Sequence, residues 1–302
     1  MKKSSNTKLK YFGLGLFLAV SANGISQTVV NGFYPKKNDV TVAVSYGSKS
    51  NTEFFRGTKL GPNPASLGTI ESSIVNLYAE YGINDWLSAT ATLPYITVNG
   101  DEGRLDPILK TDKEEGLQDL GLYLKGKIYE TRIKDGSSFK LGSAISYSFP
   151  ISNYEGAGVL SLGNSANDFS GTVIAQYTLP FNLFAEIQGG YSFRNSSDFD
   201  IPNATLFTGK LGYYNDYFYI DTVLGVQNSQ SGLDIATPEF AAAGGPKVLP
   251  ETDVDYTQLT LNLYVPFYKN MLGASAGYGT TLEGRNYNDI SGFSLGLVYT
   301  LR

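Results

Sequence analysis

The sequence predicts an all-β protein, a transmembrane antiparallel β-barrel of about twelve strands. Three observations lead to this fold class: an N-terminal export signal, runs of about ten residues in which apolar and polar side chains alternate, and connections that alternate between long and short. The composition agrees, because 22 Tyr and 34 Gly among 302 residues suit a barrel wall better than the apolar core of a soluble domain.

Residues 1–26 are predicted to be a secretory signal peptide. Basic residues precede an apolar run at 11–20, and small residues follow up to Ser26, where we expect cleavage. The ten-residue run is too short for a spanning helix, which needs about 20 residues. The barrel would then comprise residues 27–302. The basic residues are Lys2, Lys3, Lys8 and Lys10.

Charge and cysteine content limit the chemistry of the exported chain. Removing the signal takes away four lysines and no acid, so the formal charge of −5 becomes −9, which argues against a nucleic-acid partner. The chain has no cysteine, so hydrogen-bonded sheet and burial must stabilise it without disulfides.

The alternation begins at Asp39 and continues through twelve runs of strand length. The clearest runs are 72–83 and 86–98, which a short polar turn joins. In a later run Leu122 and Leu124 are predicted to face lipid, whereas Lys125 faces the interior. A soluble β-sandwich would also alternate, with its apolar face packed inward. The export signal, the connection lengths and the Tyr-rich apolar face favour the barrel.

The connections are expected to alternate in length, as they do in outer-membrane barrels, where the periplasmic turns are short. An even number of strands then places both termini on the periplasmic side. Outward aromatic residues near the strand ends would lie at the bilayer interface. Long connections are expected near 48–71, 99–117, 150–168, 195–203, 228–253 and 282–290, and short ones near 82–85, 130–137, 180–182, 214–216 and 266–270.

Charged residues on the inward face are the candidate lumen-lining site. Two interpretations remain open, because a nearly balanced set could pair and fill the barrel or could line a solute path. A basic strip of Lys125, Lys127 and Lys140 would face Glu186 and Asp221 across the lumen and attract an anionic or polar-headed solute. The predicted lumen-lining residues are Glu80, Asp119, Lys125, Lys127, Lys140, Glu186, Arg194, Lys210 and Asp221.

Catalysis is not expected, and neither is a cofactor or a metal. The chain has no histidine, the usual base of hydrolases and acyltransferases near neutral pH. The acidic stretch from Asp101 to Glu115 does not match a calcium loop, so we interpret it as a solvated surface. The connection 228–253 is partly apolar, and two arrangements are open for it: folding over the mouth or packing on itself.

A family resemblance rests on two stretches. Residues 116–125, Gly-Leu-Gln-Asp-Leu-Gly-Leu-Tyr-Leu-Lys, are followed by Ser-Phe-Pro-Ile-Ser-Asn-Tyr at 148–154. Together they resemble the outer-membrane family named for the meta-pathway of phenol degradation, which lies near the long-chain fatty-acid channels. The resemblance implies uptake of small, often apolar molecules. The chain departs from those channels in two ways: only residues 27–38 precede the first strand, where they have a plug, and the last residue is Arg302 rather than an aromatic.

The expected function is passive passage of a small solute, apolar or anionic, across the bacterial outer membrane. A non-conducting structural or assembly-partner barrel with interaction loops is the main alternative, and an adhesin displayed by the outer loops is the third. The expected partners are outer-membrane lipid and lipopolysaccharide, the barrel-assembly machinery and the solute itself.

Overall fold

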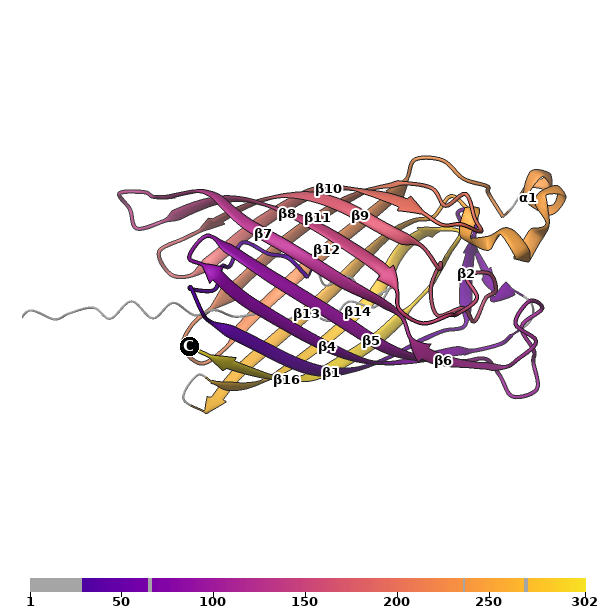
Figure 1. Cartoon of the computed structure of the whole chain (residues 1–302), viewed down its shortest axis with the longest axis horizontal. Coiled ribbons are helices and arrows are strands. Elements are labelled where there is room, and N and C mark those ends of the chain that lie inside the picture. The colour runs from indigo at the N-terminus through magenta and orange to yellow at the C-terminus, as the bar shows by residue number, and fades with distance from the viewer. Residues whose placement is uncertain (1–28, 65–66, 236, 269–270) are drawn as a thin grey trace, which may run out of the picture.

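The computed structural model describes residues 29–302 except 65–66, 236 and 269–270 (Figure 1). The predicted signal peptide lies outside the described residues. No helix within the described part of the chain is both long and apolar enough to cross a membrane.

Twelve antiparallel strands close into the predicted barrel, which is therefore confirmed. Closure occurs at the first strand, which pairs with the last strand on one side and with β4 on the other. The strands of the wall are β1 (Val40–Asn51), β4 (Ile70–Asn84), β5 (Leu87–Asn99), β7 (Asp119–Arg132), β8 (Ser138–Pro150), β9 (Asn167–Thr178), β10 (Leu183–Asn195), β11 (Ala204–Tyr214), β12 (Tyr219–Ser229), β13 (Asp255–Tyr268), β14 (Leu272–Arg285) and β16 (Ser291–Leu301).

Several smaller elements lie at one end of the barrel. In Figure 1, β2 and α1 lie at the end opposite to the C-terminus. The strand β6 extends the pairing of β5 beyond the start of β7, and β2, β3 and β15 form a small separate sheet. These elements are β2 (Glu53–Arg56), β3 (Lys59–Pro62), β6 (Lys113–Leu117), β15 (Tyr287–Asn288), the helix α1 (Pro238–Ala243) and the 3-10 segment η2 (Gly245–Glu251).

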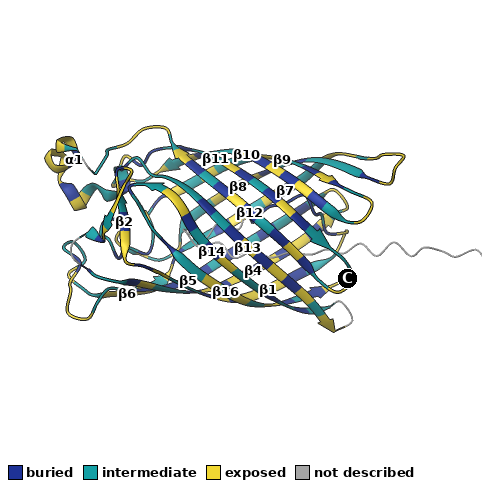
Figure 2. Cartoon of the chain, turned by 180° about the vertical axis from the view of Figure 1, so that it is seen from behind, coloured by how far each residue is buried: buried dark blue, intermediate teal, exposed yellow. Residues whose placement is uncertain are grey.

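Side chains alternate between the two faces of the wall, as strand geometry requires. Figure 2 shows buried and exposed residues alternating along the strands. On β7, Leu122 is 43% exposed and Lys125 only 2%. The apolar outer face meets lipid in a barrel of this kind, and exposed aromatic residues gather at the short-turn end, where they suit the bilayer interface. These aromatic residues are Trp86, Tyr129, Phe181, Tyr217 and Phe267.

The N-terminal segment occupies the interior of the barrel. Residues 29–33 are buried, and Phe33 packs in an aromatic cluster with Phe184 and Tyr219 of the wall. The ring centroids of Phe33 and Phe184 are 5.2 Å apart, in an edge-to-face arrangement. The stretch that precedes the first strand is thus short, but it enters the lumen. We call residues 29–34 the N-terminal plug.

Candidate functional site

The plug is held by hydrogen bonds to side chains of the wall. The amide of Gly32 donates to Glu186 Oε2 over 2.7 Å, and Gln188 Nε2 donates to the carbonyl oxygen of Val30 over 3.0 Å. From the other side, Lys125 Nζ donates to the carbonyl oxygen of Phe33 over 2.5 Å. The plug therefore bridges β7 and β10, which lie apart in the wall.

Two buried ion pairs surround the plug. Lys125 Nζ lies 3.4 Å from Glu80 Oε1, and Lys210 Nζ lies 3.2 Å from Glu186 Oε1. All four side chains are buried, and removing one member of such a pair costs about 3 to 5 kcal/mol because it leaves a buried charge unpaired. Charges predicted from the sequence to face inward thus meet in one layer and hold the plug there.

Asp221 belongs to the same layer but forms no salt bridge within the described part of the chain. Its carboxylate accepts hydrogen bonds from the Tyr219 hydroxyl at 2.6 Å and from Asn262 Nδ2 at 2.8 Å. Two neutral donors therefore satisfy this buried acid within the wall.

The three lysines of the predicted basic strip lie against aromatic rings of the plug. Lys125 lies 4.9 Å from the centre of the Tyr34 ring, and Lys127 lies 5.8 Å from the same ring. Lys140 lies 5.6 Å from the centre of the Phe33 ring. Such distances allow cation–π attraction. Lys127 Nζ also forms a salt bridge with Glu130 Oε2 at 2.6 Å. The strip thus has partners other than Asp221.

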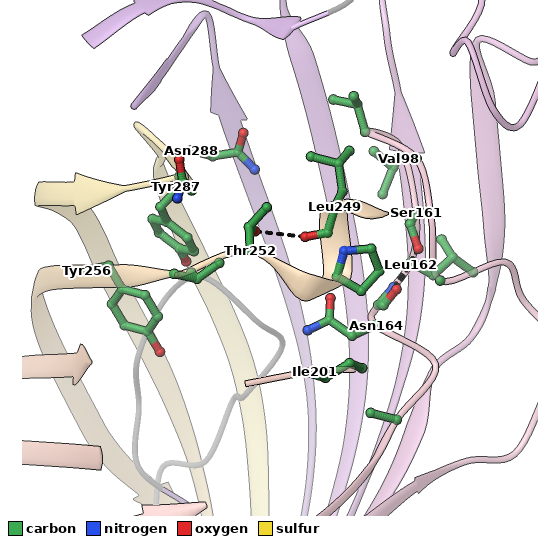
Figure 3. A pocket seen from close by; sticks show the side chains of 18 of the residues that line it. Val98, Ser161, Leu162, Asn164, Ile201, Leu249, Thr252, Tyr256, Tyr287 and Asn288 are labelled. Carbon is green, nitrogen blue, oxygen red and sulfur yellow. Dashed lines mark hydrogen bonds between the residues drawn. The ribbon is translucent and has the colours of Figure 1, made fainter. Parts of the chain in front are cut away.

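A cavity of about 340 Å³ lies beyond the plug at the end that carries the long loops. We call it the vestibule. Of the predicted lumen-lining residues, Asp119 and Arg194 line it, so the sequence-derived set divides between two sites. Figure 3 shows Tyr256 and Tyr287 on one side of this cavity and Val98 and Leu162 on the other.

The polar wall of the vestibule centres on Arg194. Its Nε lies 3.4 Å from Asp168 Oδ2, and its Nη2 donates to Gln227 Oε1 over 2.8 Å. Asp119, on a different strand, accepts a hydrogen bond from the Tyr154 hydroxyl at 2.5 Å. Burial and the Asp119 carboxylate raise the pKa of Tyr154 above its ordinary value of 10.0, so this hydroxyl stays a donor.

Several vestibule residues were missed at the sequence level. Lys49 and Asp168 line the cavity, and the period-two rule places both on the inward face, so parity could have found them. Tyr256 and Tyr287 stack with ring centroids 4.6 Å apart. No sequence signal pairs these two, because Tyr287 lies on β15, outside the barrel wall.

The connection between β12 and β13 combines both arrangements that the sequence left open, because part of it lines the vestibule and Leu233 pairs with Thr252 within it. Leu249 and Pro250 of this connection line the cavity. Arg285 of β14 fastens it, with Nη1 2.7 Å from Asp234 Oδ2 and Nε 3.8 Å from Asp253 Oδ2. Burial, and then repulsion from Asp255, raises the pKa of Asp253. We call residues 230–254 the lid loop.

The interpretation of the acidic stretch as solvated is wrong for Asp106, which is fully buried. Its Oδ1 accepts from the amides of Ile108 and Leu109, and its Oδ2 accepts from those of Val159 and Leu160. A single carboxylate therefore ties the connection after β5 to the connection after β8, which forms part of the vestibule.

Solved structures share this architecture, although no family model and no curated protein matches the sequence. The COG4313 outer membrane channel from Pseudomonas putida F1 superposes with a TM-score of 0.66 at 14% identity, covering 94% of this chain and all of that chain. The NanC porin superposes with a TM-score of 0.50 at 11% identity, covering 86% of this chain and all of that chain. The chain thus has the fold of bacterial outer-membrane channels.

Proposed function

We propose that the protein is an outer-membrane channel for passive passage of a small solute, closed at rest by its N-terminal plug. The observation that carries the proposal is the layout of the lumen. The loop end holds a vestibule, and the lumen also holds a barrier made of N-terminal residues rather than of wall side chains alone.

The contacts of the plug support a removable barrier. It is held by hydrogen bonds and aromatic packing, and the chain has no cysteine that could fix it covalently. One wall residue beneath it is poorly satisfied, since neither amide atom of the buried Gln176 side chain has a hydrogen-bond partner. Leaving such a group unpaired costs about 1 to 3 kcal/mol, which water would relieve once the plug departs.

The fold of outer-membrane channels and the apolar outer face support a location in the bacterial outer membrane, in contact with its lipid and lipopolysaccharide after insertion by the barrel-assembly machinery. Membership of the family named for the meta-pathway of phenol degradation, and the absence of catalysis, belong to the same proposal.

Planar-bilayer recording tests it, with the native chain compared with a variant that lacks residues 29–34. The deletion leaves every wall strand intact, so we expect it to raise the single-channel conductance and the flux of small solutes into loaded liposomes. The filled lumen favours one competing function, a non-conducting structural barrel. A correctly folded deletion variant with neither conductance nor flux would establish that function instead.

A further inference from the structure

The vestibule has an apolar side and a polar side. Its apolar side comes from β4, β5 and the connection after β8, with Ile70, Ile96, Val98 and Leu162 all buried. Its polar side comes from β9, β10 and β12, with Asp168, Arg194 and Gln227. Two wall strands, β7 and β8, separate β5 from β9 in one direction, and four, β13, β14, β16 and β1, separate β12 from β4 in the other, so the two sides occupy different sectors of the barrel.

The acceptors of Asp168 and Gln227 on the polar side are already used. Asp168 accepts hydrogen bonds from Ser170 at Oδ1 and from Ser192 at Oδ2, and its Oδ2 also lies against the Arg194 guanidinium. The amide of Gln227 accepts from Arg194 and donates to the carbonyl oxygen of Val254 over 3.1 Å. At these two residues, an incoming donor would therefore have to displace contacts that the protein already makes.

Donor capacity remains at Arg194. Its Nε and Nη2 contact the wall residues named above, whereas its Nη1 donates no hydrogen bond to any of the described residues. A guanidinium presents five N–H groups, and it binds carboxylates through two parallel hydrogen bonds. The unused capacity of the polar side is thus cationic and donating.

From this arrangement we infer that the vestibule is a binding subsite for a small amphiphilic carboxylate. The carboxylate meets Arg194, and an apolar or aromatic body lies against Ile96, Val98 and Leu162. A volume of about 340 Å³ suits one such molecule, since pockets for small ligands start near 300 Å³. The inference names the solute class of the proposed channel, and so rests on that function, but binding can be measured without any transport.

Binding of three probes to the purified, detergent-solubilised full chain tests the inference. The probes 4-phenylbutyrate, 4-phenylbutanol and 4-phenylbutylamine share one body and differ only in the head group. Calorimetry and saturation-transfer NMR should show the carboxylate binding about tenfold more tightly than the alcohol, because hydrogen bonds to charged groups contribute more than neutral ones. The amine should bind most weakly. Butyrate, which lacks the ring, should also bind weakly.

Variants locate the subsite. Arg194→Gln combined with Asp168→Asn removes the cation without leaving a carboxylate unpaired, and it should abolish the preference for the carboxylate. Val98→Thr keeps the shape of the apolar side but adds a hydroxyl, and it should weaken all ring-bearing probes. The matched control combines Lys113→Gln with Glu115→Gln, an exposed pair 2.7 Å apart on β6 that does not line the vestibule.

The outcomes separate the two claims. Carboxylate binding that the control leaves intact and the Arg194 double variant reduces about tenfold supports the subsite, whether or not the deletion variant conducts. Equal binding of alcohol and carboxylate, tighter binding of the amine, or the same loss in the control variant would overturn the subsite while leaving the channel proposal standing.

Discussion

The backbone amide of Gly32 donates a hydrogen bond to Glu186 Oε2, although 154 positions separate the two residues in the chain. The same carboxylate pairs with Lys210 of the neighbouring strand through its other oxygen. A single wall residue therefore joins the ion-pair layer of the barrel to the N-terminal plug. Changes at this contact should show how firmly the plug closes the lumen.

Gly32→Val should unseat the plug. A Cβ built at Gly32 would lie 2.7 Å from Gln176 Oε1 and 2.8 Å from Gln176 Cβ, closer than real contacts allow. The substitution lies in the plug and not in the wall, so the barrel should still fold and keep the gel mobility of the native chain. We expect higher single-channel conductance in planar bilayers. The control is Gly189→Val, because nothing lies within 4 Å of a Cβ at that exposed wall position. Equal conductance of the two variants would mean that the plug does not close the path.

Gln176→Leu should have the opposite effect. The side chain of Gln176 is buried with both amide atoms unpaired, so an apolar residue of similar size removes a cost of about 1 to 3 kcal/mol from the plugged state. We expect a higher melting temperature and fewer openings per unit time.

The matched control is Gln188→Leu. Gln188 is equally buried, but its amide donates to the carbonyl oxygen of Val30 and to Glu186. Losing those bonds should loosen the plug and increase opening. If both glutamine variants changed opening in the same direction, the hydrogen-bond account of plug retention would be wrong.

Leu122→Arg should impair assembly by placing a charge in lipid. Leu122 is exposed on the outer face of β7, and an arginine near the bilayer midplane costs about 2 to 4 kcal/mol. Folded yield, read from the difference in gel mobility between boiled and unboiled samples, should fall sharply. The inward comparison combines Lys125→Gln with Glu80→Gln, which leaves neither buried charge unpaired and should fold in higher yield. Similar yields for the two would contradict the assigned facing.

The sequence could predict which wall side chains point outward and which point into the lumen, because strand geometry alone determines this. Alternation places Leu122 and Lys125 on opposite faces whatever the rest of the barrel does. The ion pairs were not predictable in the same way, since Glu80 and Lys125 lie on β4 and β7 with β5 between them. Their meeting depends on side-chain reach across the curved interior, which no sequence period encodes.

The plug could not be predicted for a related reason. Residues 29–34 form no strand or helix, so they carry no periodic pattern, and their partners lie far away in the sequence. The division of the charged set between plug and vestibule also depends on height along the barrel axis. Parity assigns Asp119 and Lys125 to the same face, but only the assembled structure shows that one lies in the vestibule and the other beneath it.

The lid loop should close more firmly as the pH falls from neutral toward 3.8, the ordinary pKa of an aspartate. Burial and repulsion from Asp255 raise the pKa of Asp253 in the docked loop, so the docked state binds a proton more tightly than the undocked state does. Docking is therefore weakest where Asp253 is ionised in both states, and it strengthens as the pH falls through the raised pKa. Below 3.8 the carboxylate is protonated in both states, and this contribution stops growing.

Amide hydrogen exchange in residues 230–254, corrected for the intrinsic pH dependence of exchange, measures this docking. We expect protection in the native chain to increase between neutral pH and about pH 4. Asp253→Asn should be well protected throughout and lose most of the pH dependence, because it removes both the buried charge and its repulsion from Asp255. Arg285→Gln is the opposing control: it removes the contacts to Asp234, Asp253 and Asp255, at 2.7, 3.8 and 3.5 Å, and should lower protection at every pH. Protection that instead decreased in the native chain as the pH fell over this range would show that ion pairs of Arg285, rather than the charge of Asp253, dominate the pH response of the lid loop.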